Sequence, residues 1–336
     1  MRYYGGKEKL LNFIEQALSD LEMPDKPVAV DLFSGTSVVG KFFKQQGYRV
    51  IANDYLYFCK CLAIARVVLN AEPTFTNFDF DPIKVLNQLS GEHGFFSENY
   101  SPIGICKRQY FTASNALKID AIRSQIESWR ASRDINTVEL EYLLASLLEA
   151  MNLTSNISGT YAAFLKTWDP RAMNDLVLSH PVLTSGPDDC EAHNEDANLV
   201  VSKLHGDILY LDPPYNQRQY SSNYFLLDVV ARGWFGTKPE VRGITGMRDN
   251  SSYRSAFCLK AEALPRLEDL VSLTTCRYVL LSYNDEGVIK GSDIVDMMSK
   301  YGSLSTFSNP HPRYRSNNHN PNKPSTVESL YLLKKD

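Results

Sequence analysis

Three short runs of apolar residues in the chain each end at an acidic side chain. The runs, with their terminal acids, occupy residues 28–31, 48–54 and 208–212. Each has the length and the residue types of a buried parallel strand. A turn that carries Gly35 follows the first run, and a helical pattern then continues to Gln46 and ends at Gly47. The order strand, turn, helix and strand predicts an α/β fold.

Longer periodic segments predict the remaining elements. About 140 residues separate Asp54 from Asp196, far more than a simple crossover needs, so we expect an inserted domain. Its apolar spacing predicts a mostly helical structure. Helices are expected at 10–18, 114–130, 138–151 and 225–231, and strands at 277–281 and 327–333. We expect one domain formed by residues 1–60 and 190–336, and an inserted domain at 61–189.

The four residues Asp212, Pro213, Pro214 and Tyr215 carry the strongest indication of function. The two prolines cannot donate to a strand ladder, so the acid and the ring lie at a strand's carboxyl end, where open α/β sheets bind ligands. A planar exocyclic amine is a weak nucleophile because its lone pair is delocalised. Asp212 and the carbonyl of Pro213 can accept hydrogen bonds from such an amine while Tyr215 stacks on the base. The alternative is an ordinary exit from a strand into a loop.

The first two predicted strands have the pattern of half a nucleoside-binding unit. Asp54, at the end of the second strand, is placed to bind ribose hydroxyls. The dinucleotide fingerprint needs three closely spaced glycines, whereas only Gly35 and Gly40 are present. This pattern disfavours a pyrophosphate ligand and allows a nucleoside without phosphate, such as S-adenosylmethionine.

A glycine–lysine segment stands first in the chain, at residues 2–7. Its two glycines permit close backbone approach, and Lys7 offers a cation for a carboxylate. This segment, the loop at 31–35 and the tetrad at 212–215 occur in the order found in the Dam-like N6-adenine DNA methyltransferases. The chain resembles that family over roughly residues 1–60 and 190–336.

The resemblance implies a Rossmann-like S-adenosylmethionine-dependent methyltransferase sheet with an inserted, mostly helical target-recognition domain. It places Tyr3 and Lys7 beside the methionine part of the cofactor and Asp54 at the ribose, and residues 194–197 look like the acidic contact to its adenine. The loop departs from the family at Ser37, where another glycine is frequent. The expected cofactor-binding residues are Tyr3, Gly5, Gly6, Lys7, Asp31, Phe33, Ser34, Gly35, Asp54, Asp196 and Asp212.

The resemblance also implies the reaction. A site-specific DNA methyltransferase of this kind rotates an adenine out of a short duplex target and methylates its N6 from S-adenosylmethionine. Such an enzyme belongs to a restriction-modification or phage or host modification system. The expected catalytic residues are Asp212, Pro213, Pro214 and Tyr215. An RNA adenine methyltransferase and a catalytically inactive nucleic-acid-binding module with a retained cofactor fold remain alternatives, whereas Asp212 disfavours a cytosine N4 enzyme, whose tetrad more often begins with serine.

Charge changes this picture only locally. The chain has 35 Lys plus Arg against 39 Asp plus Glu, and a net charge of −4 argues mildly against a dedicated nucleic-acid binder. Residues 301–324, however, contain no acid and several basic side chains, which suits a flexible segment that contacts phosphate; a solvated loop is the alternative. Residues 152–161 could read base edges or form a structural loop. The expected DNA-binding residues are Arg218, Arg313, Arg315, Lys323, Lys166 and Arg171.

The six cysteines lack zinc-site spacing, so we expect no metal and reduced thiols. The N-terminal residues do not resemble a signal peptide, and no apolar run approaches the ~20 residues that span a bilayer. We therefore expect a cytoplasmic monomer whose partner is double-stranded DNA and not a membrane. The resemblance is compatible with a separately encoded restriction endonuclease as a further partner.

Overall fold

The computed structural model describes residues 6–312 and 325–336, and the chain divides into two compact units. A sheet unit consists of Lys7–Tyr55, Gly186–Gln219 and Ser255–Asp336. A helical unit consists mainly of Leu56–Ser185 and Tyr220–Arg254. The second of these helical segments had been expected in the domain formed by 190–336. It lies in the helical unit because the apolar side chains of α10 (Phe225–Arg232) belong to the helical core.

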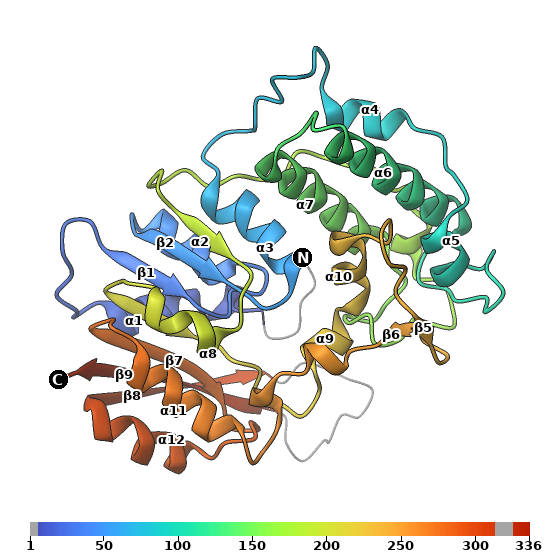
Figure 1. Ribbon diagram of the computed structural model, residues 1–336. Helices are drawn as coiled ribbons and strands as arrows, with labels where there is room; N and C mark the ends of the chain where they lie inside the picture. The colour runs from blue at the N-terminus through green and yellow to red at the C-terminus, as the bar shows by residue number, and fades with distance from the viewer. Residues whose placement is uncertain (1–5, 313–324) are drawn as a thin grey trace. The chain divides into compact units, whose positions relative to one another are not determined.

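The sheet unit is built on a seven-stranded sheet with the order β3-β2-β1-β4-β7-β9-β8 (Figure 1). The strands are β1 (Val28–Asp31), β2 (Arg49–Asn53), β3 (Glu191–His193), β4 (Ile208–Leu211), β7 (Tyr278–Asn284), β8 (Gly302–Pro312) and β9 (Ser325–Lys335). The first five in the sheet order pair in parallel, and β9 pairs antiparallel with both β7 and β8. The mixed α/β class expected from the sequence is confirmed.

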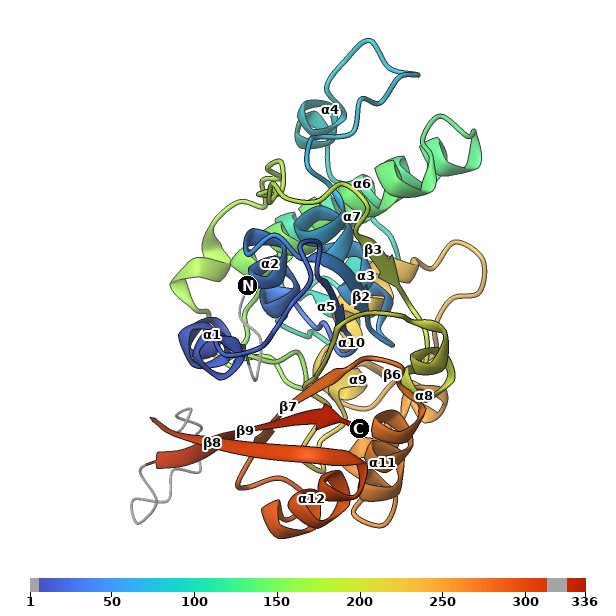
Figure 2. The same cartoon turned by 90° about the vertical axis from the view of Figure 1, so that its left-hand side faces the viewer.

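Helices cover both faces of this sheet (Figures 1 and 2). They are η1 (Glu8–Leu10), α1 (Leu11–Leu18), α2 (Val38–Gln45), α8 (Ala197–Val200), η4 (Val201–Lys203), η6 (Ala256–Cys258), α11 (Ala263–Leu273), α12 (Gly291–Met298) and η7 (Ser299–Tyr301). Because side chains alternate along a strand, Leu209 and Leu211 pack in the core beneath α8, α11 and α12, whereas Tyr210 points to the other face and meets Phe43 of α2. The acid that follows Leu211 continues this alternation.

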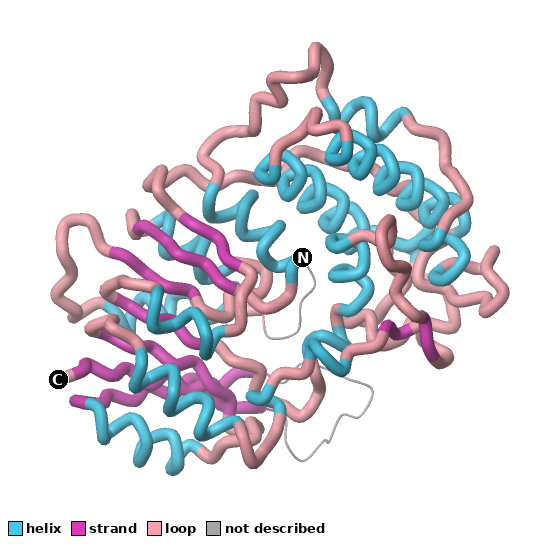
Figure 3. The backbone as a smooth tube through the Cα atoms, in the orientation of Figure 1, coloured by secondary structure: helices cyan, strands magenta, loops and turns pink. Residues whose placement is uncertain are grey.

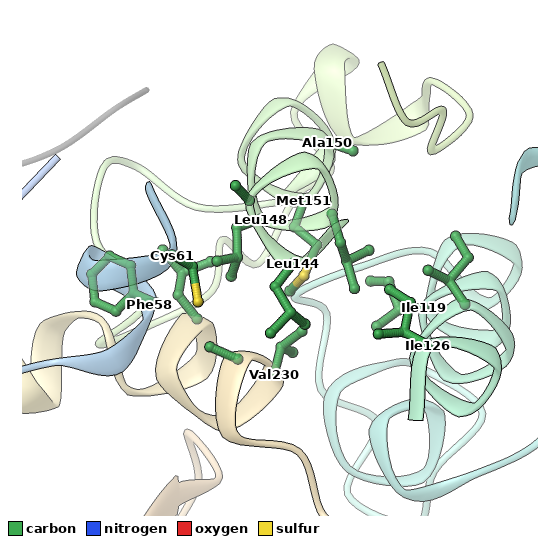
Figure 4. Packing of buried hydrophobic residues seen from close by; sticks show 14 of the residues in the cluster. Phe58, Cys61, Ile119, Ile126, Leu144, Leu148, Ala150, Met151 and Val230 are labelled. Carbon is green, nitrogen blue, oxygen red and sulfur yellow. The ribbon is translucent and has the colours of Figure 1, made fainter. Parts of the chain in front are cut away.

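The helical unit has its own apolar core (Figure 4). Its helices are α3 (Tyr57–Ala63), the π-helix η2 (Ile64–Val68), α4 (Pro82–Gln88), α5 (Phe95–Tyr100), α6 (Ala113–Ala131), α7 (Thr137–Thr154), η3 (Pro170–Met173), α9 (Tyr220–Asn223), α10 and η5 (Ser251–Tyr253). Phe58 of α3, Ile119 of α6, Leu144 of α7 and Val230 of α10 meet in this core. A capping box between Asn136 and Glu139 explains why α7 begins at Thr137.

Strands are few in the helical unit, where β5 (Val241–Arg242) and β6 (Met247–Arg248) form a short hairpin (Figure 3). In the sheet unit, residues 302–312, which the sequence suggested as part of a flexible segment, form β8 and pair with β9. The strand forms because it pairs with β9 over 11 residues. Its sequence did not predict a strand, because Ser, Thr and Asn on an edge strand lack the alternation of apolar and polar residues. Among the described residues, no helix has the length and apolar character needed to cross a membrane.

Candidate active site

The carboxyl ends of β1, β2 and β4 bring three acids to one edge of the sheet. Asp31 is the last residue of β1 and pairs in register with Ala52 of β2 and with Tyr210 of β4. Asp54 and Asp212 directly follow those two neighbouring strands. Because the strands run in parallel, all three acids lie at the same edge, as the sequence predicted.

The loop between β1 and α2 is fixed by its neighbours at this edge. The N–H of Ser34 donates to the carbonyl of Asn53 at 2.9 Å, and the N–H of Gly35 donates to Asp54 Oδ2 at 2.9 Å. Gly35 and Ser37 have φ values of 50° and 57°, in the left-handed region that favours glycine. Ser37 therefore occupies, at an energetic cost, a position whose backbone suits the glycine that is frequent in the family.

Asp31 is a buried acid with an unusual lack of partners. Its side chain is 1% exposed, and neither carboxylate oxygen has a well-formed hydrogen bond among the described residues. Burial, and then the charges of Asp212 and Asp54, raise the pKa of Asp31 to about 8, although the N–H of Gly40 acts against this rise. The Oγ atoms of Ser34 and Ser37 are likewise buried without a hydrogen-bond partner in the described structure. This end of β1 and the loop after it therefore contain several buried oxygen atoms with unused hydrogen-bonding capacity.

Lys7 lies at the start of η1 and is only 5% exposed. Its Nζ is 3.0 Å from Asp212 Oδ1 and 2.5 Å from Glu328 Oε1. Burial acts to lower the pKa of Lys7, but the charges of these two carboxylates outweigh it and raise the pKa above its usual value. The protein therefore supplies two carboxylates to an ammonium for which the sequence had suggested only the carboxylate of the cofactor.

Asp212 and Tyr215 lie immediately after β4. Burial raises the pKa of Asp212 to about 6; Lys7 acts to lower it and Glu328 to raise it. The half-buried Tyr215 ring meets the edge of Tyr283, with ring centroids 6.1 Å apart and an interplanar angle of 70°. The carbonyl of Tyr215 accepts a hydrogen bond from the N–H of Val288 at 2.8 Å. One backbone hydrogen bond and one ring contact thus position Tyr215, the last residue of the tetrad.

Two further expected cofactor residues have identifiable structural partners. Phe33 packs edge-on against Phe257, with ring centroids 5.1 Å apart. Asp196 is exposed and caps α8 by accepting the N–H of Asn198 at 2.9 Å. Asn53, which the sequence analysis missed, bonds the backbone of Glu195 through both its Oδ1 and its Nδ2. It thereby ties the segment before Asp196 to the end of β2.

The expected DNA-binding residues are only partly described. Arg218 and Lys166 have exposed side chains, whereas Arg171 of η3 forms an ion pair with Asp169, the residue just before that helix. The following expected site residues lie outside the described part of the chain: Tyr3, Gly5, Arg313, Arg315 and Lys323. Gly6, which precedes Lys7, is described and exposed.

Residues 152–156 do not offer base-reading groups. Asn156 is fully buried; its Nδ2 donates to the carbonyls of Gln109 and Leu165, and its Oδ1 accepts the N–H of Asp169. All the hydrogen-bonding groups of that amide are therefore used within the helical unit. The buried polar members of this segment are Asn152, Thr154, Ser155 and Asn156. The polar side chains at the end of α7 and just after it therefore serve structure rather than recognition.

Glu328 is the other residue of the site that the sequence analysis missed. It is the only acid in the apolar pattern at 327–333. An acid within a predicted apolar strand needs a partner if it is buried, and this was the signal by which the sequence could have indicated it. No cluster of three or more His, Cys, Asp or Glu side chains in the described residues could hold a metal ion.

Comparison with known proteins agrees with this geometry. The profile of a family described as D12 class N6 adenine-specific DNA methyltransferase matches residues 3–297. The type II methyltransferase M.FokI of Planomicrobium okeanokoites is 38% identical over 100% of this chain and 53% of its own length. The modification methylase StsI of Streptococcus sanguinis is 37% identical over 100% of this chain and 52% of its own length.

A further relative is the type II methyltransferase M.NlaIII of Neisseria lactamica, 35% identical over 100% of this chain and 99% of its own length. The chain thus spans about half the length of the first two relatives and nearly all of the third. The resemblance carried by the three ordered motifs is confirmed. The chain belongs to the D12 class of N6 adenine-specific DNA methyltransferases.

Proposed function

We propose that the protein is a site-specific DNA methyltransferase that transfers a methyl group from S-adenosylmethionine to N6 of an adenine in a short duplex target. One observation carries the proposal: the carboxylate of Asp212 forms an ion pair with Lys7 at the end of β4, close to Tyr215 in sequence and next to Asp31, whose carboxylate has no hydrogen-bond partner among the described residues. Membership of the family supports the choice of adenine N6.

The β1–α2 loop fits the cofactor. The carboxylate of Asp31 and the hydroxyls of Ser34 and Ser37 are buried with unused hydrogen-bonding capacity, which suits a ligand with cationic and polar groups. When bound, S-adenosylmethionine supplies an electrophilic methyl group on a sulfonium. We assign Asp54 to the ribose and Asp196 to the adenine of the cofactor.

The tetrad supplies positioning and electrostatic stabilisation. Asp212 and the carbonyl of Pro213 accept hydrogen bonds from the target amine, and Tyr215 stacks on the base. Pro214, like Pro213, lacks a backbone N–H and keeps this segment out of the sheet. Holding the amine at the reacting distance and stabilising the charge that develops on its nitrogen requires no covalent intermediate. Rotating the adenine out of the duplex costs a few kcal/mol, which stacking and hydrogen bonding offset.

We assign phosphate contacts to Arg218, Lys166 and Arg171, and to the basic residues of the segment that follows β8. Arg171 already forms an ion pair with Asp169, so its contact with phosphate either replaces that ion pair or is made by the part of the guanidinium that Asp169 leaves free. Target recognition is assigned to the helical unit, and the protein is proposed to act as a monomer. The names of relatives that are type II modification enzymes support a role in a restriction-modification system, beside a separately encoded endonuclease.

The direct test is to offer labelled S-adenosylmethionine with duplex DNA and with RNA in parallel and to identify the modified nucleoside. We expect N6-methyladenine in DNA, and single-molecule sequencing of DNA from an expressing host should show it in one short sequence. Label in RNA alone, or in cytosine, would refute the proposal. Cofactor binding without transfer to any nucleic acid would instead identify an inactive binding module.

A further inference from the structure

Glu328 is a buried acid on β9, beyond the part of the chain that the family profile matches. It lies opposite Asn284 in the β7–β9 ladder. Tyr331 and Leu333 of the same strand face the core beneath α11 and α12, so alternation places Glu328 on the opposite face of the sheet. That face also carries Tyr210 of β4. A carboxylate in such a position is costly unless it is paired.

Glu328 is paired through both of its oxygens. Oε1 accepts from Lys7 Nζ at 2.5 Å and from Ser282 Oγ at 2.7 Å, and Oε2 accepts from Asn284 Nδ2 at 3.3 Å. Burial acts to raise the pKa of Glu328, but the charge of Lys7 and these hydrogen bonds outweigh it and hold the pKa below its usual value. Glu328 is therefore ionised at neutral pH.

The charges of the cluster do not cancel. Lys7 alone would neutralise Asp212, 3.0 Å away, whereas Glu328 adds a second carboxylate to the same ammonium. The three side chains together carry a net negative charge in a largely buried position. Methyl transfer from a sulfonium moves positive charge onto the amine nitrogen, and a fixed negative charge beside that nitrogen stabilises the transition state.

We propose that Glu328 is a positioning residue of the methyl-transfer site. It holds Lys7 between two carboxylates, so that the ammonium does not neutralise Asp212 and the cluster presents a net negative charge to the target amine. The proposal rests on the proposed function of the tetrad. Ser282 and Asn284 of β7 also donate to the Glu328 carboxylate, Ser282 to the oxygen that Lys7 contacts and Asn284 to the other oxygen. The contact between Lys7 and Glu328 therefore joins the first residues of the sheet unit to β9, its last strand in the sequence.

A pH readout separates this role from a merely structural one. The charged groups that shift the pKa of Asp212 are Lys7 from the start of η1 and Glu328 from β9, and Asp212 in turn raises the pKa values of Tyr210 on β4 and Asp31 on β1. Among them, Glu328 raises the pKa of Asp212 and Lys7 lowers it. Removing the negative charge of Glu328 must therefore lower the pKa of Asp212, whatever its effect on stability.

The test compares Glu328→Gln with the wild type and with Glu268→Gln, which removes a half-buried carboxylate 3.0 Å from Lys300 in the same unit. For Glu328→Gln we expect kcat to fall about 10- to 100-fold, the range for a hydrogen bond to a charged group, with little change in KM for DNA. The acid limb of the kcat profile, expected near pH 6 in the wild type, should move to lower pH. Glu268→Gln should change neither, and Glu328→Asp, which keeps the charge, should keep the wild-type limb.

A Glu328→Gln variant with wild-type kcat and an unmoved acid limb would overturn the proposal. If that variant fails to fold, Ser282→Ala decides: it removes one neutral donor to Glu328 and should cost about 3- to 10-fold in kcat, and unchanged kcat would count against the role. Carboxyl-carbon NMR of Asp212, assigned with Asp212→Asn, reports the pKa without turnover. A wild type that methylates nothing would refute the proposed function, while the NMR shift would still decide the role of Glu328.

Discussion

At the scale of single residues, two neighbouring acids differ in protonation state at neutral pH. Asp212 has Lys7 beside it, and its pKa is about 6. Asp31 has no ion pair among the described residues, and its pKa is about 8. At pH 7 Asp212 is therefore mostly ionised and ready to accept a hydrogen bond, whereas Asp31 is mostly protonated until a cation reaches it.

Cofactor binding should release a proton from Asp31. A cationic ligand next to this carboxyl lowers its pKa from about 8 to below neutral, so the proton is lost at pH 7 and affinity rises with pH up to about 8. Calorimetry of S-adenosylmethionine in buffers of different ionisation enthalpy measures the release. The matched variant Asp31→Asn should bind S-adenosylmethionine more weakly and should release no proton on binding. A binding enthalpy independent of buffer in the wild type would contradict this assignment.

The acid and the ring of the tetrad should differ in their effects on catalysis. Asp212→Asn and Asp212→Ala should abolish measurable methyl transfer in a folded protein, because the amine loses its charged acceptor. Tyr215→Ala should reduce activity about 5- to 150-fold, since stacking of a base on an aromatic ring contributes ~1 to 3 kcal/mol. Tyr215→Phe keeps the ring and should remain close to wild type in single-turnover assays. Inactivity of Tyr215→Phe would show that the hydroxyl has a direct role.

At the scale of elements, the sequence predicted those with strong local patterns. The apolar runs that end at Asp31, Asp54 and Asp212 became β1, β2 and β4, because continuous apolar residues suit a strand buried on both faces. Helices α6 and α7 also lie where their periodicity placed them. Short β3 and the polar edge strand β8 have no such pattern and form through pairing with distant strands.

The candidate site divides in the same way. Its acids follow strands and could be read from the sequence, whereas the partnership of Lys7 with Glu328 joins residues 321 positions apart. No local pattern predicts such a contact, because it depends on the order of the strands in the sheet, which places β9, the strand of Glu328, next to β7. Asn53 was missed for the same reason: it is a polar residue at the end of β2, and Glu195, which it bonds, lies on a distant segment.

Helix α2 allows a test of its two ends. Ser37, at its start, has φ 57° and ψ 32°, a left-handed conformation that costs an L-residue roughly 1 to 2 kcal/mol. Ser37→Gly should therefore raise the free energy of unfolding by ~1 kcal/mol, after part of the gain is offset by the greater freedom of the unfolded chain. Gly47, just past the other end, has φ 86° and open space around it, so Gly47→Ala should lower stability by ~1 kcal/mol. Denaturant unfolding measures both, and a destabilised Ser37→Gly would show that its buried hydroxyl matters more than its backbone.

At the scale of the whole molecule, charge distribution matters more than net charge. The formal net charge of −4 opposes the approach of DNA, so binding must depend on local basic groups. Residues 313–324 contain Arg313, Arg315 and Lys323 and no acid, and β8 and β9 lead into and out of this segment. Its basic composition, between the two longest strands of the sheet, makes it the best candidate for a phosphate-binding segment.

Replacing Arg313 and Arg315 by Ala should weaken binding to any duplex and reduce the magnitude of the slope of log K against log salt by ~0.9 for each phosphate that is no longer neutralised. The control is Arg277→Ala, which removes an exposed cation at the amino end of β7, the opposite edge of the sheet from Asp212. Fluorescence anisotropy at several salt concentrations gives both slopes. The control should keep the wild-type slope, because a change in net charge alone leaves the neutralised phosphates as they were. If the double variant also keeps it, residues 313–324 do not bind phosphate, and the affinity for DNA must come from Arg218, Lys166 and Arg171.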